Sequence, residues 1–171
     1  MDRIAVFAGS LDPITNGHLG IIATAVRLFP KVYVCIAINA AKTNTLFTVD
    51  QRIELARRAI APFQESVVVD STSGLLVDYL QSVGAHALLR GLRDGLDLAQ
   101  EWRIEDTNLR ICRTRNYNFD TVYLRPDNDS RYVSSSVVRE LIGYEDWAII
   151  RTLVPPEVEV LMKEYLNMTS S

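Results

Sequence analysis

Short apolar runs alternate along this chain with segments whose apolar residues recur every three or four positions. The apolar runs predict five β-strands, over about 3–7, 31–38, 66–70, 86–89 and 121–124. After the first of them, the spacing of Leu19, Ile22 and Val26 predicts a helix with one buried face. Strands rich in Val, Ile and Leu that alternate with helices are typical of a parallel sheet with helices on both faces.

The later helices are predicted by capping signals and by the same periodicity. Thr48 and Gln51 form a capping-box pattern, after which Ile53, Ala56 and Ile60 mark one buried face. Further helices are predicted over about 75–83 and 96–113, from about 135, and from 155–156 onward. We therefore expect a single Rossmann-like, doubly wound α/β domain over 1–166 with a five-stranded parallel sheet, followed by a flexible tail over 167–171.

Polar or glycine-rich segments follow each of the predicted strands. They are residues 9–18, the stretch ending at Lys42, and residues 71–76, 90–93 and 134–136. Parallel sheets of this class bind ligands beyond the carboxyl ends of their strands, near the point where the strand order reverses. We therefore expect these segments to meet at one edge of the sheet.

The first of these segments carries the most specific pattern. An apolar strand runs into Gly9-Ser10, and a Thr-x-Gly-His motif ending at His18 opens the next helix. This order directs backbone N–H groups, a hydroxyl and an imidazole toward the positive end of a helix dipole, which suits a phosphate group. A capped helix with a structural histidine is the alternative. Neither a Walker loop nor a G-x-G-x-x-G fingerprint is found in the sequence.

Composition narrows the classes of partner. The 171 residues are 48% hydrophobic and 23% charged, with a net charge of −3, so no basic field indicates nucleic-acid binding. Cys35 and Cys112 lack metal-ligand spacing, and Cys35 is predicted to be a buried thiol within a strand. Neither a spanning helix nor a signal peptide is predicted, which favours a cytoplasmic protein without membrane contact.

Two further segments carry cations and hydroxyls suited to phosphate. Arg90 and Arg93 directly follow the fourth strand, and an arginine fork suits bidentate phosphate binding, although surface salt bridges are the alternative. Residues 134–136 are three serines before an apolar periodic segment, which predicts a capped helix N-terminus rather than a linker. By itself, the sequence around Lys42 favours a solvated lysine, whereas Glu101 is about equally an exposed helix carboxylate or a ligand contact.

Together these motifs resemble the nucleotidyltransferase superfamily with the T/H-x-G-H signature, and within it the phosphopantetheine adenylyltransferase family, over residues 3 to about 165. The resemblance implies contacts to ATP from residues of the first, fourth and fifth segments and of the long helix: Ser10, Leu11, His18, Gly91, Leu92, Arg93, Glu101, Ser130, Arg131, Tyr132, Val133, Ser134, Ser135 and Ser136. It implies contacts to the acceptor from Ser10, Lys42, Leu76 and Arg90. The chain departs from the family at Thr43, where a second lysine is common, and at Leu98, Gln100 and Ser130, which are usually aromatic.

The implied reaction transfers the adenylyl group of ATP to 4′-phosphopantetheine and gives dephospho-coenzyme A and pyrophosphate. His18, Lys42 and Arg93 are the implied catalytic residues; they stabilise charge at the α-phosphate, while Mg²⁺ arrives with ATP and no side-chain metal site is expected. The resemblance also implies a homohexamer and feedback inhibition by coenzyme A. Two alternatives stay open: another adenylyl- or cytidylyltransferase, such as the nicotinate mononucleotide or glycerol-3-phosphate enzymes, and a nucleotide-binding regulatory module without transfer activity.

Overall fold

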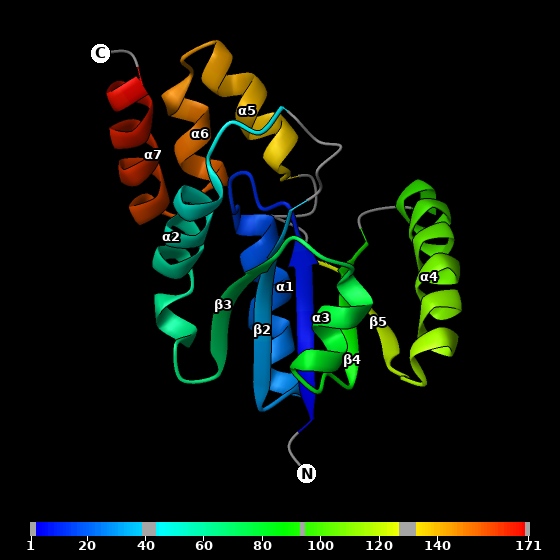
Figure 1. The fold of residues 1–171 in the computed structure, drawn as a ribbon. Helices are drawn as coiled ribbons and strands as arrows, with labels where there is room; N and C mark the ends of the chain where they lie inside the picture. Colours follow the sequence, from blue (N-terminus) through cyan, green and yellow to red (C-terminus); the bar gives the residue numbers. More distant parts are fainter. Residues whose placement is uncertain (1–2, 39–43, 93–94, 127–132, 170–171) are drawn as a thin grey trace.

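The chain is described by a computed structural model that covers residues 3–38, 44–92, 95–126 and 133–169. Five strands form one sheet in the order β3-β2-β1-β4-β5 (Figure 1). All four neighbouring pairs are parallel. The strands are β1 (Ile4–Gly9), β2 (Lys31–Ala37), β3 (Val67–Thr72), β4 (Ala87–Gly91) and β5 (Asp120–Leu124). The predicted five-stranded parallel sheet is confirmed.

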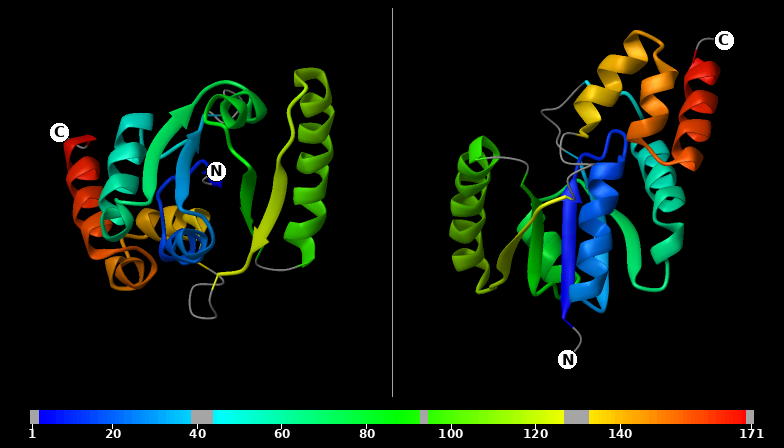
Figure 2. Two further views of the ribbon diagram at one scale, coloured as in Figure 1. Left: turned by 90° about the horizontal axis from the view of Figure 1, so that it is seen from below. Right: turned by 180° about the vertical axis from the view of Figure 1, so that it is seen from behind.

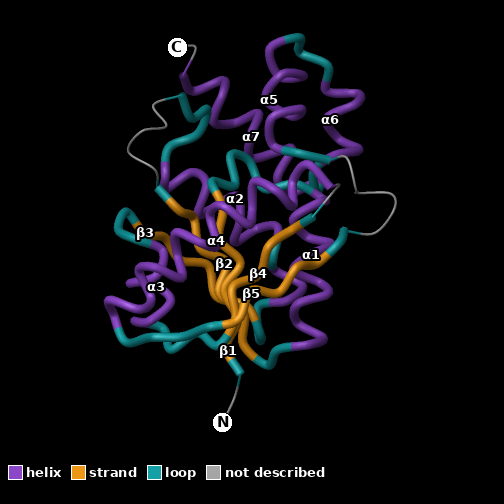
Figure 3. Tube along the Cα trace, turned by 90° about the vertical axis from the view of Figure 1, so that its right-hand side faces the viewer, coloured by secondary structure: helices purple, strands orange, loops and turns teal. Residues whose placement is uncertain are grey.

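Helices connect the strands and cover both faces of the sheet. They are α1 (Asn16–Leu28), α2 (Val49–Ala59), the 3-10 turn η1 (Ala61–Phe63), α3 (Leu76–Ser82), α4 (Gly95–Arg115), α5 (Ser135–Gly143), α6 (Trp147–Leu153) and α7 (Pro156–Thr169). The view from behind shows α1 running alongside β1, and α4 stands beside the edge strand β5 (Figure 2). The helices α5 to α7 gather beyond the carboxyl ends of the strands (Figure 3).

Side chains alternate along each strand and build two cores. On β1, Ala5 and Phe7 belong to the larger core, together with buried residues of α1, α2, α5, α6 and α7. Their neighbours Val6 and Ala8 belong to the smaller core, which includes residues of α3 and Cys112 of α4. Because successive strand residues point to opposite faces, nearly every position of β1 must be apolar, as in other doubly covered parallel sheets. Apart from Ile4 and Gly9 at its ends, β1 is buried throughout.

The structure also differs from the expectations in several details. The strands β1 and β4 continue two residues further than expected because Gly9 and Gly91 still pair with the neighbouring strands. The short helix α6 was not predicted; the side chain of Asp146 caps it by accepting from the N–H of Ile149 at 3.2 Å. Helix α7 continues to Thr169, so residues 167–169 are helical rather than part of a loose tail. Neither Gly nor Pro interrupts the helix there.

Among the described residues, no helix is both long enough and apolar enough to cross a membrane.

Candidate functional site at the carboxyl ends of β1 and β4

A pocket of about 380 Å³ opens beyond the carboxyl ends of β1 and β4. The strand order reverses between these two strands, since the chain leaves β1 toward β2 and β3 and then crosses to β4. This is the position at which doubly wound sheets bind ligands. The lining includes residues of three of the five segments singled out in the sequence, residues next to them, and Glu101 of α4: Phe7, Ala8, Gly9, Ser10, Leu11, Gly17, His18, Ile21, Arg90, Gly91, Glu101, Pro126, Val133, Ser134, Ser135, Ser136 and Arg139.

The loop after β1 forms one wall of this pocket. Its residues Gly9, Ser10 and Leu11 line the cavity. Leu11 has a φ of 44°, in the left-handed region that residues with a side chain rarely occupy. Its side chain is only 2% exposed, so burial helps to hold this turn in place. The sequence predicted the glycine turn and the hydroxyl, but not the left-handed leucine.

His18 is the third residue of α1 and belongs to a capping box with Thr15. The backbone N–H of Thr15 donates to Nδ1 of His18 at 3.0 Å. Because that N–H can only donate, Nδ1 is an acceptor, and the neutral imidazole carries its hydrogen on Nε2. The ring also lies beside Phe7, with 6.0 Å between the ring centroids. The first turn of α1 therefore fixes both the orientation and the tautomer of a side chain that lines the pocket.

Arg90 and Glu101 form a bidentate ion pair in the pocket wall. Nε and Nη2 of Arg90 donate to the two carboxylate oxygens of Glu101, at 2.5 and 2.8 Å. Nη1 of Arg90 donates to the carbonyl of Ala8 at 3.2 Å. The side chains are 17% and 18% exposed, so neither surface salt bridges nor an exposed helix carboxylate describes them. Arg90 was predicted to contact the acceptor and Glu101 to contact ATP; the structure pairs the two side chains with each other.

The face of α4 that carries Glu101 is polar over two further turns. Glu105 accepts from the hydroxyl of Tyr123 at 2.8 Å. Burial, with the hydrogen bond to Glu105 as the next cause, raises the pKa of Tyr123 to about 12. Asn108 follows on the same face at 8% exposure, and its side-chain nitrogen has no hydrogen-bond partner among the described residues. A buried donor without a partner is rare and indicates a ligand, a water molecule or strain.

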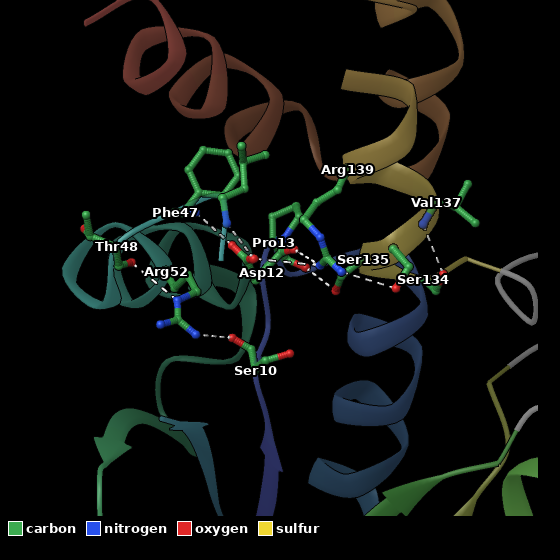
Figure 4. A network of polar contacts seen from close by, with 12 residues as sticks. Ser10, Asp12, Pro13, Phe47, Thr48, Arg52, Ser134, Ser135, Val137 and Arg139 are labelled. Atoms are coloured by element: carbon green, nitrogen blue, oxygen red, sulfur yellow. Dashed lines mark hydrogen bonds and ion pairs between the residues drawn. The ribbon is translucent and has the colours of Figure 1, made fainter. Parts of the chain in front are cut away.

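The serine segment forms the N-terminus of α5, as predicted. Ser134 is the N-cap residue, and its hydroxyl accepts from the N–H of Val137 at 3.3 Å. The hydroxyl of Ser135 donates to the carbonyl of Pro13 at 2.7 Å, which joins α5 to the loop after β1 (Figure 4). Residues 133–136 line the pocket, so the positive end of this helix dipole lies at the cavity.

Three charged residues at this site were not predicted from the sequence: Arg139, which lines the pocket, and Asp12 and Arg52, which do not. Asp12 is 2% exposed, and its carboxylate accepts from the N–H groups of Leu46 and Phe47 at 2.9 Å each (Figure 4). Arg139 donates through Nη1 to the carbonyl of Asp12 at 2.6 Å. The same nitrogen lies 3.8 Å from the Asp12 carboxylate.

Arg52 is 4% exposed, and its Nη1 donates to the carbonyl of Ser10 at 3.0 Å. Burial lowers its pKa, and the charge of Asp12 opposes that shift. The buried face of α2 comprises Arg52, Leu55, Ala56 and Ala59, whereas Ile53 is only half-buried. The i, i+3, i+4 spacing from Arg52 was the available signal, but a charged residue is rarely assigned to a core face.

The remaining predicted residues lie away from the pocket or outside the described residues. Leu92 donates its N–H to the carbonyl of Leu124 at 2.9 Å and is not part of the pocket lining. Leu76 packs against the smaller core and does not line the pocket either. Five residues lie outside the described residues, and their roles stay predictions: Lys42, Arg93, Ser130, Arg131 and Tyr132.

The two cysteines have no role in this site. Cys35 and Cys112 are both buried and free. Burial, with the nearby charge of Asp70 as a further cause, raises the pKa of the Cys35 thiol to about 12. A thiol that keeps its proton is a poor nucleophile and a poor metal ligand. The prediction that Cys35 is a buried strand thiol is confirmed.

Comparison with known proteins gives a family and a fold. The profile of the cytidylyltransferase-like family matches residues 6–141. This range begins within β1 and ends within α5, so it includes every described segment that lines the pocket.

Similar solved structures support the same fold. The nicotinic acid mononucleotide adenylyltransferase of Plasmodium falciparum, complexed with APC, superposes with a TM-score of 0.66 at 16% identity, covering 96% of each chain. A Vibrio parahaemolyticus protein assigned as a nicotinate-nucleotide adenylyltransferase superposes with a TM-score of 0.67 at 18% identity, covering 95% of this chain and 99% of that one. TmcAL of Thermotoga maritima, bound with alpha-thio ATP, superposes with a TM-score of 0.66 at 14% identity, covering 98% of this chain but 56% of that one. At these identities the likeness is one of fold.

Proposed function

Because the chain belongs to the cytidylyltransferase-like family of nucleotidyltransferases, we propose that it transfers the adenylyl group of ATP to 4′-phosphopantetheine. The products would be dephospho-coenzyme A and pyrophosphate. The observation that carries the proposal is the pocket at the strand-order reversal. There a hydroxyl, an oriented imidazole, an arginine and the N-termini of α1 and α5 line one cavity.

The nucleotide half of the proposal is supported by the two helix N-termini. Residues from the first turns of α1 and α5 line the same pocket, and helix N-termini stabilise anions through unpaired N–H groups and the helix dipole. Ser10 and Ser136 add hydroxyl groups to that lining. A triphosphate offers several anionic oxygens and could contact both helix ends at once.

His18 would act at the α-phosphate. Its Nδ1 accepts from the backbone of Thr15, so Nε2 is the ring nitrogen that would donate to a phosphoryl oxygen. The acceptor phosphate is already anionic at pH 7, so direct in-line attack needs no strong general base. Its oxygen forms a bond to the α-phosphorus as the bond to pyrophosphate breaks. The protein would contribute positioning and charge stabilisation, with Lys42 and Arg93 as further proposed cations.

The acceptor half rests on the polar wall formed by β4 and α4. Arg90 uses three of its five N–H groups within the described structure, which leaves two for an anionic group. Asn108 lies seven residues after Glu101 on α4, outside the pocket lining, and its buried side-chain nitrogen has no partner among the described residues. A phosphorylated chain that contains amide carbonyls, such as phosphopantetheine, would suit both groups.

Mg²⁺ is proposed to bind together with ATP. No group of three or more His, Cys, Asp or Glu side chains in the described segments could hold a metal ion. Mg²⁺ commonly binds through substrate phosphates, water and only one or two carboxylates. A metal carried by the nucleotide would therefore need few ligands from the protein. When bound, the ion would neutralise charge on the triphosphate.

Nicotinate mononucleotide is the second candidate acceptor. One structural neighbour is a nicotinic acid mononucleotide adenylyltransferase and another is assigned as a nicotinate-nucleotide adenylyltransferase, although their identities of 16% and 18% show the fold alone. The sequence resemblance to the phosphopantetheine enzymes, and the amide donor at Asn108, favour the first candidate. The same resemblance leads us to propose a cytoplasmic homohexamer that coenzyme A inhibits, which light scattering and inhibition assays can test.

Pyrophosphate release with a panel of acceptors tests the proposal. Purified protein would be incubated with Mg²⁺ and ATP or CTP, together with 4′-phosphopantetheine, nicotinate mononucleotide or glycerol 3-phosphate. We expect release with ATP and phosphopantetheine, and a loss of at least about 10²-fold in the His18→Ala variant. Arg110→Ala, an exposed change on α4, is the matched control and should keep full activity. Pyrophosphate release with nicotinate mononucleotide or glycerol 3-phosphate, but not with phosphopantetheine, would refute phosphopantetheine as the acceptor. ATP binding without pyrophosphate release would indicate a regulatory module.

A further inference from the structure

A buried arginine on α2 holds the main chain of the loop after β1. Nη1 of Arg52 donates to the carbonyl of Ser10 at 3.0 Å, and its Nε donates to the carbonyl of Thr48 at 3.4 Å. The residue is only 4% exposed (Figure 4). Burying a guanidinium is unfavourable unless hydrogen bonds and an opposite charge compensate. The proposed reaction does not itself use this buried cation.

Asp12 makes a second connection between the same two segments. Its carboxylate accepts from the N–H groups of Leu46 and Phe47, two residues that lie just before α2. Asp12 also interacts electrostatically with Arg52, and Nη1 of Arg139 lies 3.8 Å from its carboxylate on the other side. The loop after β1 is therefore bonded to the start of α2 at two positions, residues 10 and 12.

Leu11 lies between these two anchors and has the left-handed φ of 44°. A residue with a side chain adopts this conformation at a cost, and it persists only where the surrounding structure determines it. Here the bonds at residues 10 and 12 determine it from both sides. The same turn sets the direction of Ser10, which lines the pocket.

We propose that Arg52, with Asp12 as the second anchor, is a positioning residue that holds the left-handed turn at Leu11 and so presents Ser10 to the nucleotide. Arg52 does not touch the ligand and acts through the carbonyl of Ser10. The inference rests on the proposed ATP site but not on the identity of the acceptor.

The affinity for ATP, measured by isothermal titration calorimetry, tests this role. Arg52→Gln should weaken ATP binding by about 10-fold or more, the scale of losing one hydrogen bond to a charged group. Arg52→Lys should restore part of the loss because an ammonium group can still donate to the carbonyl of Ser10. The matched control is Arg58→Gln on the same helix, where the arginine is 62% exposed and paired with Glu54. Wild-type affinity in Arg52→Gln would overturn the proposal.

A double-mutant cycle with Ser10→Ala separates positioning from general support of the fold. If Arg52 acts through Ser10, then adding Arg52→Gln to the Ser10→Ala variant should lower the affinity for ATP by less than about 3-fold. Fully additive losses would overturn the proposal. Circular dichroism checks folding, and if Arg52→Gln does not fold, the same cycle with Arg52→Lys decides by the same criterion. Wild-type protein that binds no ATP would refute the proposed function as well, whereas an additive cycle with normal wild-type binding refutes only this role of Arg52.

Discussion

The ion pair between Arg90 and Glu101 should contribute measurably to folding, unlike an ordinary surface pair. It joins the end of β4 to α4, a helix that also carries the polar residues Glu105 and Asn108 on the same face. Both oxygens of Glu101 accept from the guanidinium, and each side chain is less than one-fifth exposed. Bidentate geometry and partial burial both strengthen such a pair.

The magnitude follows from the geometry. Two unit charges about 4 Å apart attract by about 4 kcal/mol at an effective dielectric constant of about 20. Desolvation of both groups removes part of this gain. We therefore expect a coupling free energy of about 2 kcal/mol between Arg90 and Glu101. Double-mutant cycles on exposed ion pairs usually give only about 0.2–1 kcal/mol.

Urea unfolding of Arg90→Met, Glu101→Gln and the double variant measures this coupling. A matched control lies on the same helix, where Arg110 pairs with Asp106 and the two side chains are 74% and 66% exposed. Its coupling should stay below about 0.5 kcal/mol. If the two cycles gave equal values, partial burial would not strengthen the first pair, and our reasoning about the wall of the pocket would be wrong.

Three further predictions follow from single residues. His18→Ala should lower kcat by about 10²-fold or more while ATP affinity, measured by calorimetry, changes little; a near-normal kcat would contradict its role. Gly91→Ala places a Cβ that overlaps Cδ1 of Ile21 and should lower the free energy of unfolding in urea by about 1–3 kcal/mol, and by less when Ile21→Val removes that methyl group. Burial raises the pKa of Cys35 from 9.0 to about 12, so the unfolded chain loses this proton first and stability falls as pH rises above 9. Between pH 8 and 10, the free energy of unfolding of Cys35→Ala should therefore fall by about 1.4 kcal/mol less than that of the wild type. An equal dependence of the two unfolding free energies on pH would contradict this prediction.

The amino-acid sequence by itself determined the elements and the edge of the sheet at which the ligand groups gather. Strand and helix periodicity depend on residues two to four positions apart, and the capping box at Thr48 is a local pattern that the structure reproduces. The glycine turn at Gly9 and the helix that begins at Ser135 were predicted in the same way. Because every predicted strand is parallel, their carboxyl ends had to meet at one edge.

Only the tertiary structure decided which side chains meet within that edge. Arg90 at the end of β4 pairs with Glu101 of α4, and the carboxylate of Asp12 accepts from residues more than thirty positions away. Such contacts depend on the strand order β3-β2-β1-β4-β5, which no local spacing encodes. The buried position of Arg52 was missed for the same reason. A charged side chain is stable in a core only when partners from distant segments satisfy it, and those partners become visible only once the chain has folded.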